Sequence, residues 1–385
     1  MKVLFIRPGT SRRRKMVSPL RRQEPLELAY LANQLQDSLQ DKVEIVFIDM
    51  ELERGSFKKH LLEIQPSLVV FWGDQGQEDL VDDQASMVKD ISPESYVALA
   101  GELSEGEGSP YVDFLFRKNP VEALNETVLG IITERSLQEI NRNVATVENE
   151  TIDQPLREAD RGIFRKYQDR YYFLQYGGTV DVTSQYRLEF DEMGLIGKKD
   201  NPLRPLEDVA KDVESLVGAS VYLKDRDIWD DPKRLKRLLE LLKERNLQRE
   251  YISVGNWRTI LENESLLEEF AGIGLKVLLM GMDFPKDQDD WIFKGEVLRM
   301  IRKHEVEPVI IIREKMVKED QDALSFWLKD RKEGLVLLEG EAFEENRPIY
   351  THVSISTWAF LKWTKDHGLG EARRRQKEYK NTLLI

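Results

Sequence analysis

A group of positively charged side chains directly follows the first apolar segment and is the clearest place for chemistry in this sequence. The segment MKVLFIRPGTSRRRKMVSPLRR opens with the strand-like run KVLFI, which Arg7-Pro8-Gly9 ends. Guanidinium groups and backbone amides at the end of a strand hold phosphate or carboxylate groups. We therefore predict an anion site to which Arg7 and Arg12 to Arg14 contribute. An acidic partner protein or a solvated loop are the alternatives.

The composition excludes several classes of protein. The chain of 385 residues carries a formal net charge of -13, which argues against general binding to nucleic acid or to an anionic membrane. No apolar run approaches the roughly 18 residues that would span a bilayer. There is no signal-type cleavage pattern, so we expect a cytoplasmic protein. The hydrophobic content of 41% and the length favour two packed domains.

The sequence contains no cysteine. This excludes disulfides, thiolate nucleophiles, zinc–thiolate sites and iron–sulfur clusters ligated by cysteine. Its histidines are His60, His304, His352 and His367, and they do not have metal-ligand spacing. We therefore expect no metal centre formed by protein side chains.

Alternating strand and helix patterns occupy residues 1–135. KVLFI, KVEIVFIDM, SLVVFWG and SYVALAG are buried strands, and EPLELAYLANQLQDSL has helical spacing. Such alternation predicts an α/β domain with a doubly wound parallel sheet and right-handed crossovers. Ligands of such sheets bind beyond the carboxyl ends of the strands. Here those ends are Arg7–Thr10, Asp49–Glu51, Trp72–Gln75 and Ala100–Glu102.

Residues 136–176 are polar with weak periodicity, and we interpret them as a connector. Residues 177–318 resume the alternation, which predicts a full or partial (β/α) barrel with its site at the strand ends. A helix is expected over DDPKRLKRLLELLKERN, with Asp230 or Asp231 as N-cap and Pro232 in the first turn. Residues 319–385 are expected to form a C-terminal α/β extension.

Two sets of segments in this order resemble the cobalamin-binding radical SAM family. The first set is KVLFIRPG, EPLELAYLANQLQD, VEIVFIDM, LLEIQPSLVVFWG and VALAGE. The second is VYLKDRDIWDDPKRLKRLLELLKE, ISVGNWRTILENESLLEEFAGIGLKVLLMGMD and VEPVIII. The resemblance covers about residues 1–315. It implies a Rossmann-like cobalamin-binding domain followed by a radical-SAM-like barrel.

The departure from the family is large. The family binds a [4Fe–4S] cluster through a Cys-x3-Cys-x2-Cys loop after the first barrel strand, where this chain has YYFLQYGGTVDVTSQYRLEFDEMG. Ser184, Asp181 and Tyr186 do not replace three soft sulfur ligands of iron. Without a cluster no electron reaches SAM, so the radical chemistry of the family does not transfer. The D-x-H-x-x-G motif that ligates cobalt in other corrinoid folds is also absent.

The resemblance implies two cofactor sites. Trp72, Gly73, Asp74, Gly101 and Glu102 would lie along a corrin ring, because glycine lets the backbone approach a flat ligand. The phosphodiester tail of cobalamin is a candidate partner of Arg7 and Arg12. The alternative is an ordinary βα turn. An exposed Trp72 would indicate a ligand surface, and a buried Trp72 would indicate a turn.

The second implied site would hold SAM at the barrel strand ends. Asp225 stands where the family has the first residue of an Asp-Asp pair, with Arg226 in place of the second. Arg258 matches an arginine that closes its strand, and Asp283 stands where the family usually has Glu. The alternative is that these are polar strand ends of the usual kind.

These observations lead to three functional hypotheses. The first is a cluster-less pseudoenzyme that binds cobalamin, SAM or both as an accessory protein, with the small molecule in an interdomain crevice and a homologous or acidic protein as partner. The second is an enzyme that uses cobalamin or SAM for polar chemistry such as methyl transfer. The third is a structural subunit with vestigial sites.

Overall fold

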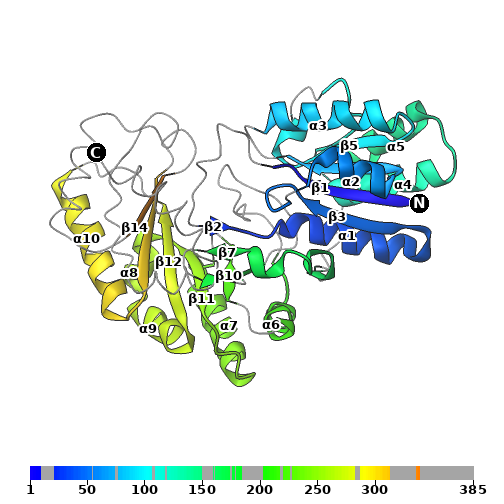
Figure 1. Ribbon diagram of the computed structural model, residues 1–385. Helices are drawn as coiled ribbons and strands as arrows, with labels where there is room; N and C mark the ends of the chain where they lie inside the picture. Colours follow the sequence, from blue (N-terminus) through cyan, green and yellow to red (C-terminus); the bar gives the residue numbers. More distant parts are fainter. Residues whose placement is uncertain are drawn as a thin grey trace. The chain divides into compact units, whose positions relative to one another are not determined.

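The computed structural model describes residues 1–9, 21–53, 55–73, 77–105, 109–117, 119–149, 159, 161–173, 176–177, 179–183, 203–216, 220–225, 228–281, 287–312 and 335–338. These residues divide into two compact units (Figure 1). The first unit falls within Met1–Val17 and Pro25–Gln168, and the second within Ser18–Glu24 and Asp169–Ile385. A short piece of the N-terminal region therefore belongs to the second unit.

The first unit is built on a parallel sheet of five strands in the order β3-β1-β4-β5-β6. The chain starts in the interior of the sheet, places β3 on one side of β1, and then adds β4, β5 and β6 on the other side. The order reverses between β1 and β4, which is the topological switch point where ligands bind in such sheets. The strands are β1 (Lys2–Arg7), β3 (Glu44–Asp49), β4 (Leu68–Trp72), β5 (Tyr96–Ala100) and β6 (Phe114–Phe116).

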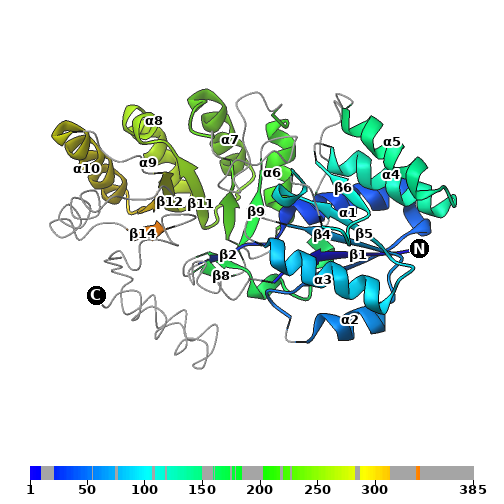
Figure 2. The same ribbon diagram turned by 90° about the horizontal axis from the view of Figure 1, so that it is seen from above.

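Helices cover both faces of this sheet, as Figure 2 shows. On one face α2 (Phe57–Ile64) and α3 (Glu78–Ile91) cover an apolar cluster that includes Leu4, Ile6 and Phe71. On the other face lie α1, α4 and α5, where α4 packs against both α1 and α5. The remaining helical elements of this unit are α1 (Leu26–Leu39), α4 (Pro120–Ile132), α5 (Leu137–Asn149), and the 3-10 turns η1 (Gln40–Lys42), η2 (Glu102–Glu105) and η3 (Arg161–Phe164).

The segment interpreted from sequence as a connector contains ordered structure that packs on the first unit. Helix α5 lies against α4. Farther along, Phe164 and Tyr167 pack edge-on against Phe47 of β3, with ring centroids 4.8 and 5.6 Å away. The units divide between Gln168 and Asp169, within the turn η4 (Gln168–Arg170). Burial of these three aromatic rings stabilises the packing of the segment before Gln168 on the first unit.

The second unit contains a six-stranded sheet in the sequential order β14-β13-β12-β11-β10-β9, and all its pairs are parallel. Among the described residues the two edge strands do not pair with each other, so the sheet is an open, partial barrel. Together with the doubly wound first unit, it confirms the predicted α/β fold class. Its strands are β9 (Val180–Val182), β10 (Val221–Leu223), β11 (Tyr251–Gly255), β12 (Leu275–Gly281), β13 (Glu307–Ile312) and β14 (Leu335–Leu338).

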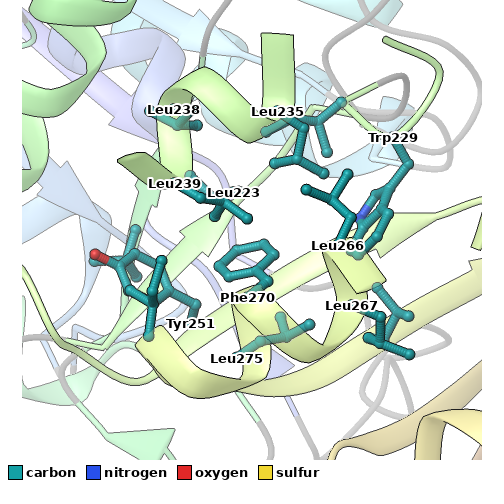
Figure 3. Packing of buried hydrophobic residues seen from close by; sticks show 14 of the residues in the cluster. Leu223, Trp229, Leu235, Leu238, Leu239, Tyr251, Leu266, Leu267, Phe270 and Leu275 are labelled. Carbon is teal, nitrogen blue, oxygen red and sulfur yellow. The ribbon is translucent and has the colours of Figure 1, made fainter. Parts of the chain in front are cut away.

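Helices line one face of this sheet (Figure 2) and bury the larger apolar cluster between themselves and the strands. Figure 3 shows Phe270 between Tyr251 and Trp229, whose ring centroids lie 5.6 and 6.1 Å from its own. A second cluster joins Phe173, which lies outside this sheet, to residues on the opposite, inner face: Tyr222, Ile252, Val254, Val277, Leu279, Val309 and Ile311. The helices are α6 (Leu206–Ser215), α7 (Pro232–Glu244), α8 (Trp257–Glu262), α9 (Glu264–Ile273) and α10 (Gln288–Lys303).

Helix α7 illustrates how the local sequence sets these elements. The side chain of Asp231 accepts a hydrogen bond from the backbone N–H of Arg234 at 3.0 Å, and Pro232 opens the first turn. Of the two N-cap candidates predicted from the sequence, Asp230 and Asp231, the structure therefore has Asp231. Leucines spaced three and four residues apart face the core and are at most 1% exposed: Leu235, Leu238, Leu239 and Leu242.

A small antiparallel sheet completes the described part of the second unit, in the order β2-β7-β8. Its strands are β2 (Arg21–Arg22), β7 (Tyr172–Phe173) and β8 (Tyr176–Gly177). Phe173 packs against Tyr222 of β10, with ring centroids 5.3 Å apart. Of the predicted C-terminal extension, residues 319–385, only β14 lies within the described residues. None of the described helices combines the length and the apolar character needed to cross a bilayer.

Candidate functional site

The first candidate residue, Arg7, ends β1 beside the topological switch point. Its guanidinium group lies 3.4 Å from the carboxylate of Asp49 and 3.2 Å from that of Glu51. Asp49 is fully buried, and the Arg7 side chain is only 18% exposed. Because two carboxylates already neutralise it, an incoming anion would have to compete with them for this arginine. The predicted contacts from Arg12 to Arg14 lie outside the described residues.

Trp72 and Gly73 end β4, on the other side of the switch point. Trp72 is 7% exposed. By the criterion set from the sequence, this burial favours a βα turn over a ligand surface. Backbone hydrogen bonds join this strand end to β5 and the segment after it: the Gly73 N–H donates to Ala100 O at 2.9 Å, and the Leu103 N–H donates to Gly73 O at 3.1 Å.

The two glycines predicted to approach a corrin ring also approach the protein's own atoms. Gly101 has a φ of +87°, and a Cβ there would lie 2.7 Å from the carbonyl oxygen of Gly73. A Cβ on Gly73 would lie 2.7 Å from a methyl carbon of Leu103. Packing within the turns is therefore a sufficient reason for glycine at both positions. Asp74 lies outside the described residues, and Glu102 begins the turn η2.

A charged cluster that the sequence did not reveal lies beyond the end of β3. The Glu53 carboxylate lies 3.1 Å from His60 Nε2 and 2.8 Å from Lys166 Nζ. Burial raises the pKa of Glu53, but the hydrogen bond and charge of Lys166, with His60, outweigh it and leave that pKa below its usual value. The cluster joins the loop after β3 to α2 and to the segment before the unit boundary.

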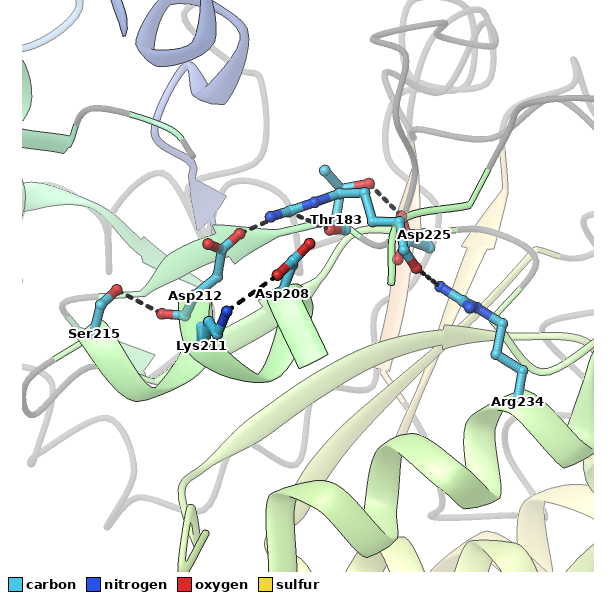
Figure 4. A network of polar contacts seen from close by, with 8 residues as sticks. Thr183, Asp208, Lys211, Asp212, Ser215, Asp225 and Arg234 are labelled. Carbon is cyan, nitrogen blue, oxygen red and sulfur yellow. Dashed lines mark hydrogen bonds and ion pairs between the residues drawn. The ribbon is translucent and has the colours of Figure 1, made fainter. Parts of the chain in front are cut away.

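In the second unit, Asp225 follows β10 and is 1% exposed. The Thr183 hydroxyl, just past β9, donates a hydrogen bond to Asp225 Oδ1 at 2.5 Å (Figure 4). Asp225 is therefore held inside the protein by a neighbouring strand and is not a polar strand end facing solvent. A buried carboxylate needs such partners, because the loss of hydration is otherwise uncompensated.

A second pair of buried polar groups, Asp181 in β9 and Lys224 directly after β10, lies between these two strands. Asp181 is fully buried, and its carboxylate lies 3.6 Å from Lys224 Nζ. The amide of Gln23 donates to the same carboxylate oxygen at 3.4 Å. The β9–β10 side of the sheet thus carries buried charged residues, whereas the inner faces of β11 and β12 are aliphatic.

Arg204 links this edge to α6. It forms an ion pair with Asp212 at 2.6 Å, and the two side chains are 2% and 4% exposed. The same nitrogen donates to the carbonyl oxygen of Thr183 at 3.0 Å. Arg234 of α7 in turn donates to Arg204 O at 2.6 Å (Figure 4). The result is a connected polar network from α6 and α7 to the ends of β9 and β10.

Arg258, the second candidate for SAM binding, differs from Asp225 in being exposed. It is exposed in the first turn of α8, after β11, and Asn256 caps that turn by accepting its backbone N–H at 3.0 Å. Since β10 and β11 are neighbouring strands, Asp225 and Arg258 follow adjacent strand ends. Asp283 lies outside the described residues. No group of three or more His, Asp or Glu side chains in the described part of the chain is placed to hold a metal ion.

Several solved structures share this architecture, and TsrM and OxsB are two of them. TsrM, a radical S-adenosylmethionine methyltransferase from Kitasatospora setae with cobalamin and a [4Fe–4S] cluster bound, matches with a TM-score of 0.62 and 15% identity, over 88% of this chain and 74% of TsrM. OxsB, a cobalamin-dependent S-adenosylmethionine radical enzyme with aqua-cobalamin and S-adenosylmethionine bound, matches with a TM-score of 0.60 and 13% identity, over 97% of this chain and 56% of OxsB. This chain has the fold of cobalamin-dependent radical SAM enzymes.

The resemblance stated from sequence is thereby confirmed at the level of the fold. No family model and no curated protein matches the sequence. The chain spans a little over half of the length of OxsB, at 56%. At these identities the likeness concerns the arrangement of helices and strands, and the chemistry has to be argued from this chain's own residues.

The residues of this radical SAM fold do not fit an iron–sulfur cluster. Such clusters are held mainly by cysteine thiolates, and the sequence has none. The polar groups near the ends of β9 and β10 are hydroxyl, carboxylate, ammonium and guanidinium groups. The oxygens are hard ligands, and the two cationic groups do not bind iron at all. The described members of this set are instead bonded to one another.

Sequence reasoning missed most of the network around Asp225. Asp181 and Lys224 carried a usable signal, because a charged residue inside an apolar strand such as VDV or next to VYL requires a buried partner. Arg204 carried none, because an arginine before a helix is ordinarily exposed. Its burial depends on α6 and β9, which lie apart in the sequence.

Proposed function

We propose that this protein is a cluster-less relative of cobalamin-dependent radical SAM enzymes that binds cobalamin, SAM or both, as an accessory protein without radical chemistry of its own. The observation that carries the proposal is the pairing of this fold, shared with TsrM over 88% of the chain, with a complete lack of cysteine. A barrel without thiolates has no route for the electron that would split SAM.

The carboxyl edge of the first unit is the proposed corrinoid site. Bound cobalamin supplies a cobalt centre able to accept and donate a methyl group. Arg7 supports this assignment by its place at the switch point, where it would meet the phosphodiester of the cofactor in competition with Asp49 and Glu51. The backbone of Gly73 and Gly101 is the surface that a flat ring would approach.

The edge of the second unit is the proposed SAM site. Among the described residues, Arg258 is an exposed cation for which no side-chain ion pair is found, so its guanidinium is available for a carboxylate. Asp225, already bonded to Thr183, acts in this proposal as a fixed negative group at the neighbouring strand end.

One observation favours a second candidate, a structural subunit with vestigial sites. Trp72 is buried, and the glycines after β4 and β5 are packed against the protein itself. A partner for either role would be an intact homologous enzyme or an acidic protein that meets the basic segment Arg12 to Arg14. Capture of such a partner by the protein, and its loss in an Arg12/Arg13/Arg14→Glu variant, tests this assignment.

The corrinoid proposal is tested with hydroxocobalamin. The purified protein is mixed with the cofactor and desalted, and its visible spectrum is recorded. We expect retained corrin absorbance, reduced in Arg7→Ala and unchanged in Lys2→Ala, which alters the opposite end of the same strand. A spectrum without corrin bands in the wild-type protein rejects corrinoid binding and leaves SAM binding alone or the structural subunit.

The SAM proposal is tested by calorimetric titration. Binding heat is expected for the wild-type protein, with weaker binding in Arg258→Ala and no change in Arg299→Ala, an exposed arginine of α10. No heat from the wild-type protein removes the SAM site. Reductive cleavage of SAM by the purified protein alone would instead contradict the absence of radical chemistry.

A further inference from the structure

Strand β9 forms one edge of the partial barrel, and its backbone alternates between a paired and an open side. The N–H of Val180 donates to Ser220 O, and the carbonyl of Val182 accepts from Lys224 N–H, so these two residues face β10. Since successive residues of a strand point their backbone groups in opposite directions, Asp181 and Thr183 face the other side. In the described part of the chain no strand lies there.

Two side chains bind two of the four backbone groups on that open side, the N–H of Asp181 and the carbonyl oxygen of Thr183. Glu24 Oε1 accepts the N–H of Asp181 at 3.1 Å, and Arg204 donates to the carbonyl oxygen of Thr183 at 3.0 Å. One side chain supplies the acceptor and the other supplies the donor, as the two backbone groups require. We propose that Glu24 and Arg204 close the edge of β9 in place of a neighbouring strand and so position its polar residues.

Burial and anchoring make this arrangement specific. Glu24 is 3% exposed and Arg204 is 2% exposed, so water does not provide the alternative partner that an open edge normally has. Arg204 is fixed by Asp212, whose carboxylate lies 2.6 Å from the same guanidinium nitrogen. Glu24 is fixed by the short strand β2, which ends two residues before it and pairs with β7.

The backbone groups that are capped belong to the residues that carry the buried polar side chains. Asp181 pairs with Lys224, and the hydroxyl of Thr183 bonds to Asp225. A shift of β9 by loss of either cap would move both contacts. Glu24 and Arg204 are therefore positioning residues for this edge of the barrel, whichever ligand the protein binds.

Glu24 also ends the β1–α1 connection, directly before Pro25 and α1. The connection that begins with Arg7 thus finishes with the residue that caps β9. This explains why a segment of the N-terminal region belongs to the second unit: its last side chains, Gln23 and Glu24, are bonded to Asp181.

Residue-resolved hydrogen exchange on the full chain tests the proposal. In Glu24→Ala the amide of Asp181 is expected to exchange roughly tenfold faster or more, because a charge-assisted hydrogen bond is lost. The amides of Val180 and Val182, which face β10, are expected to keep their protection. Glu24→Gln retains the side-chain oxygen and is expected to restore slow exchange, whereas Glu262→Ala, on the exposed face of α8, is expected to change nothing.

Unchanged protection of Asp181 in Glu24→Ala would overturn the proposal. The proposal would also fail if the Asp181 amide exchanged as fast in Glu24→Gln as in Glu24→Ala, because the side-chain oxygen at position 24 would then not be the group that protects this amide. If Glu24→Ala does not fold, Glu24→Asp takes its place, because the shorter side chain draws the acceptor away from the Asp181 amide and should speed its exchange; protection equal to that of the wild-type protein would then overturn the proposal. None of these measurements uses cobalamin or SAM, so they succeed or fail independently of the proposed function.

Discussion

The hydroxyl of Thr183 donates to the buried carboxylate of Asp225 at 2.5 Å, and this contact joins the ends of β9 and β10. Thr183→Val removes the donor while keeping the shape of the side chain. We expect the free energy of unfolding to fall by about 1.5–3 kcal/mol, the range for hydrogen bonds to charged groups. Urea denaturation measures this change. Thr183→Ser keeps the hydroxyl and should recover most of the loss; equal loss in both variants would show that packing of the methyl group matters instead.

The ion pair between Arg204 and Asp212 is expected to behave as a buried pair. Arg204→Met leaves a buried carboxylate without its cation, and we expect a loss of about 3–5 kcal/mol. Adding Asp212→Leu to that variant removes the stranded charge and should return part of the stability. Chemical denaturation of both single variants and the double variant gives the coupling energy. Additive losses would mean that the two side chains do not depend on each other.

Gly101 and Gly272 offer a matched comparison of two glycine-to-alanine changes. A Cβ at Gly101 would clash with Gly73 O in a backbone conformation with φ of +87°, whereas at Gly272 in α9 it would meet no atom within 4 Å. Gly101→Ala should destabilise by about 1–3 kcal/mol. Gly272→Ala should stabilise by roughly 0.5–1 kcal/mol, because alanine is the better helix residue. Thermal unfolding distinguishes them, and a neutral Gly101→Ala would contradict the packing described for the β4 and β5 turns.

The contacts of Glu53 make stability depend on pH in the acid range. Because its pKa in the folded protein lies below the usual value of 4.5, the stabilisation is present above that pH and is lost as the pH falls through the lowered pKa. We expect the stability difference between the wild-type protein and Glu53→Gln to be constant near neutral pH and to shrink below about pH 4.5. Since Lys166 is 61% exposed, added salt should reduce the difference. A difference that grows on acidification would give the opposite sign for the pKa shift.

The apolar layers of both units could be predicted from the sequence because they depend on periodicity. The leucines of α7 and the continuous apolar runs of the parallel strands bury the residues that their spacing indicates. The candidate site could be predicted only in its position along the chain. Arg7, Trp72 and Asp225 do lie at strand ends, but their burial and partners depend on residues such as Glu51 and Thr183 that are distant or unremarkable in the sequence.

The sequence by itself determined the α/β class, the strand-end positions and the lack of any thiolate for iron, because these follow from residue type and short-range pattern. Only the tertiary structure decided what those positions face. It placed Trp72 in the interior, gave Arg7 two carboxylates, and closed the edge of β9 with Glu24 and Arg204. Burial and pairing of a charge depend on which elements meet in space, and residues more than 150 positions apart, Glu24 and Asp181, meet only after the chain has folded.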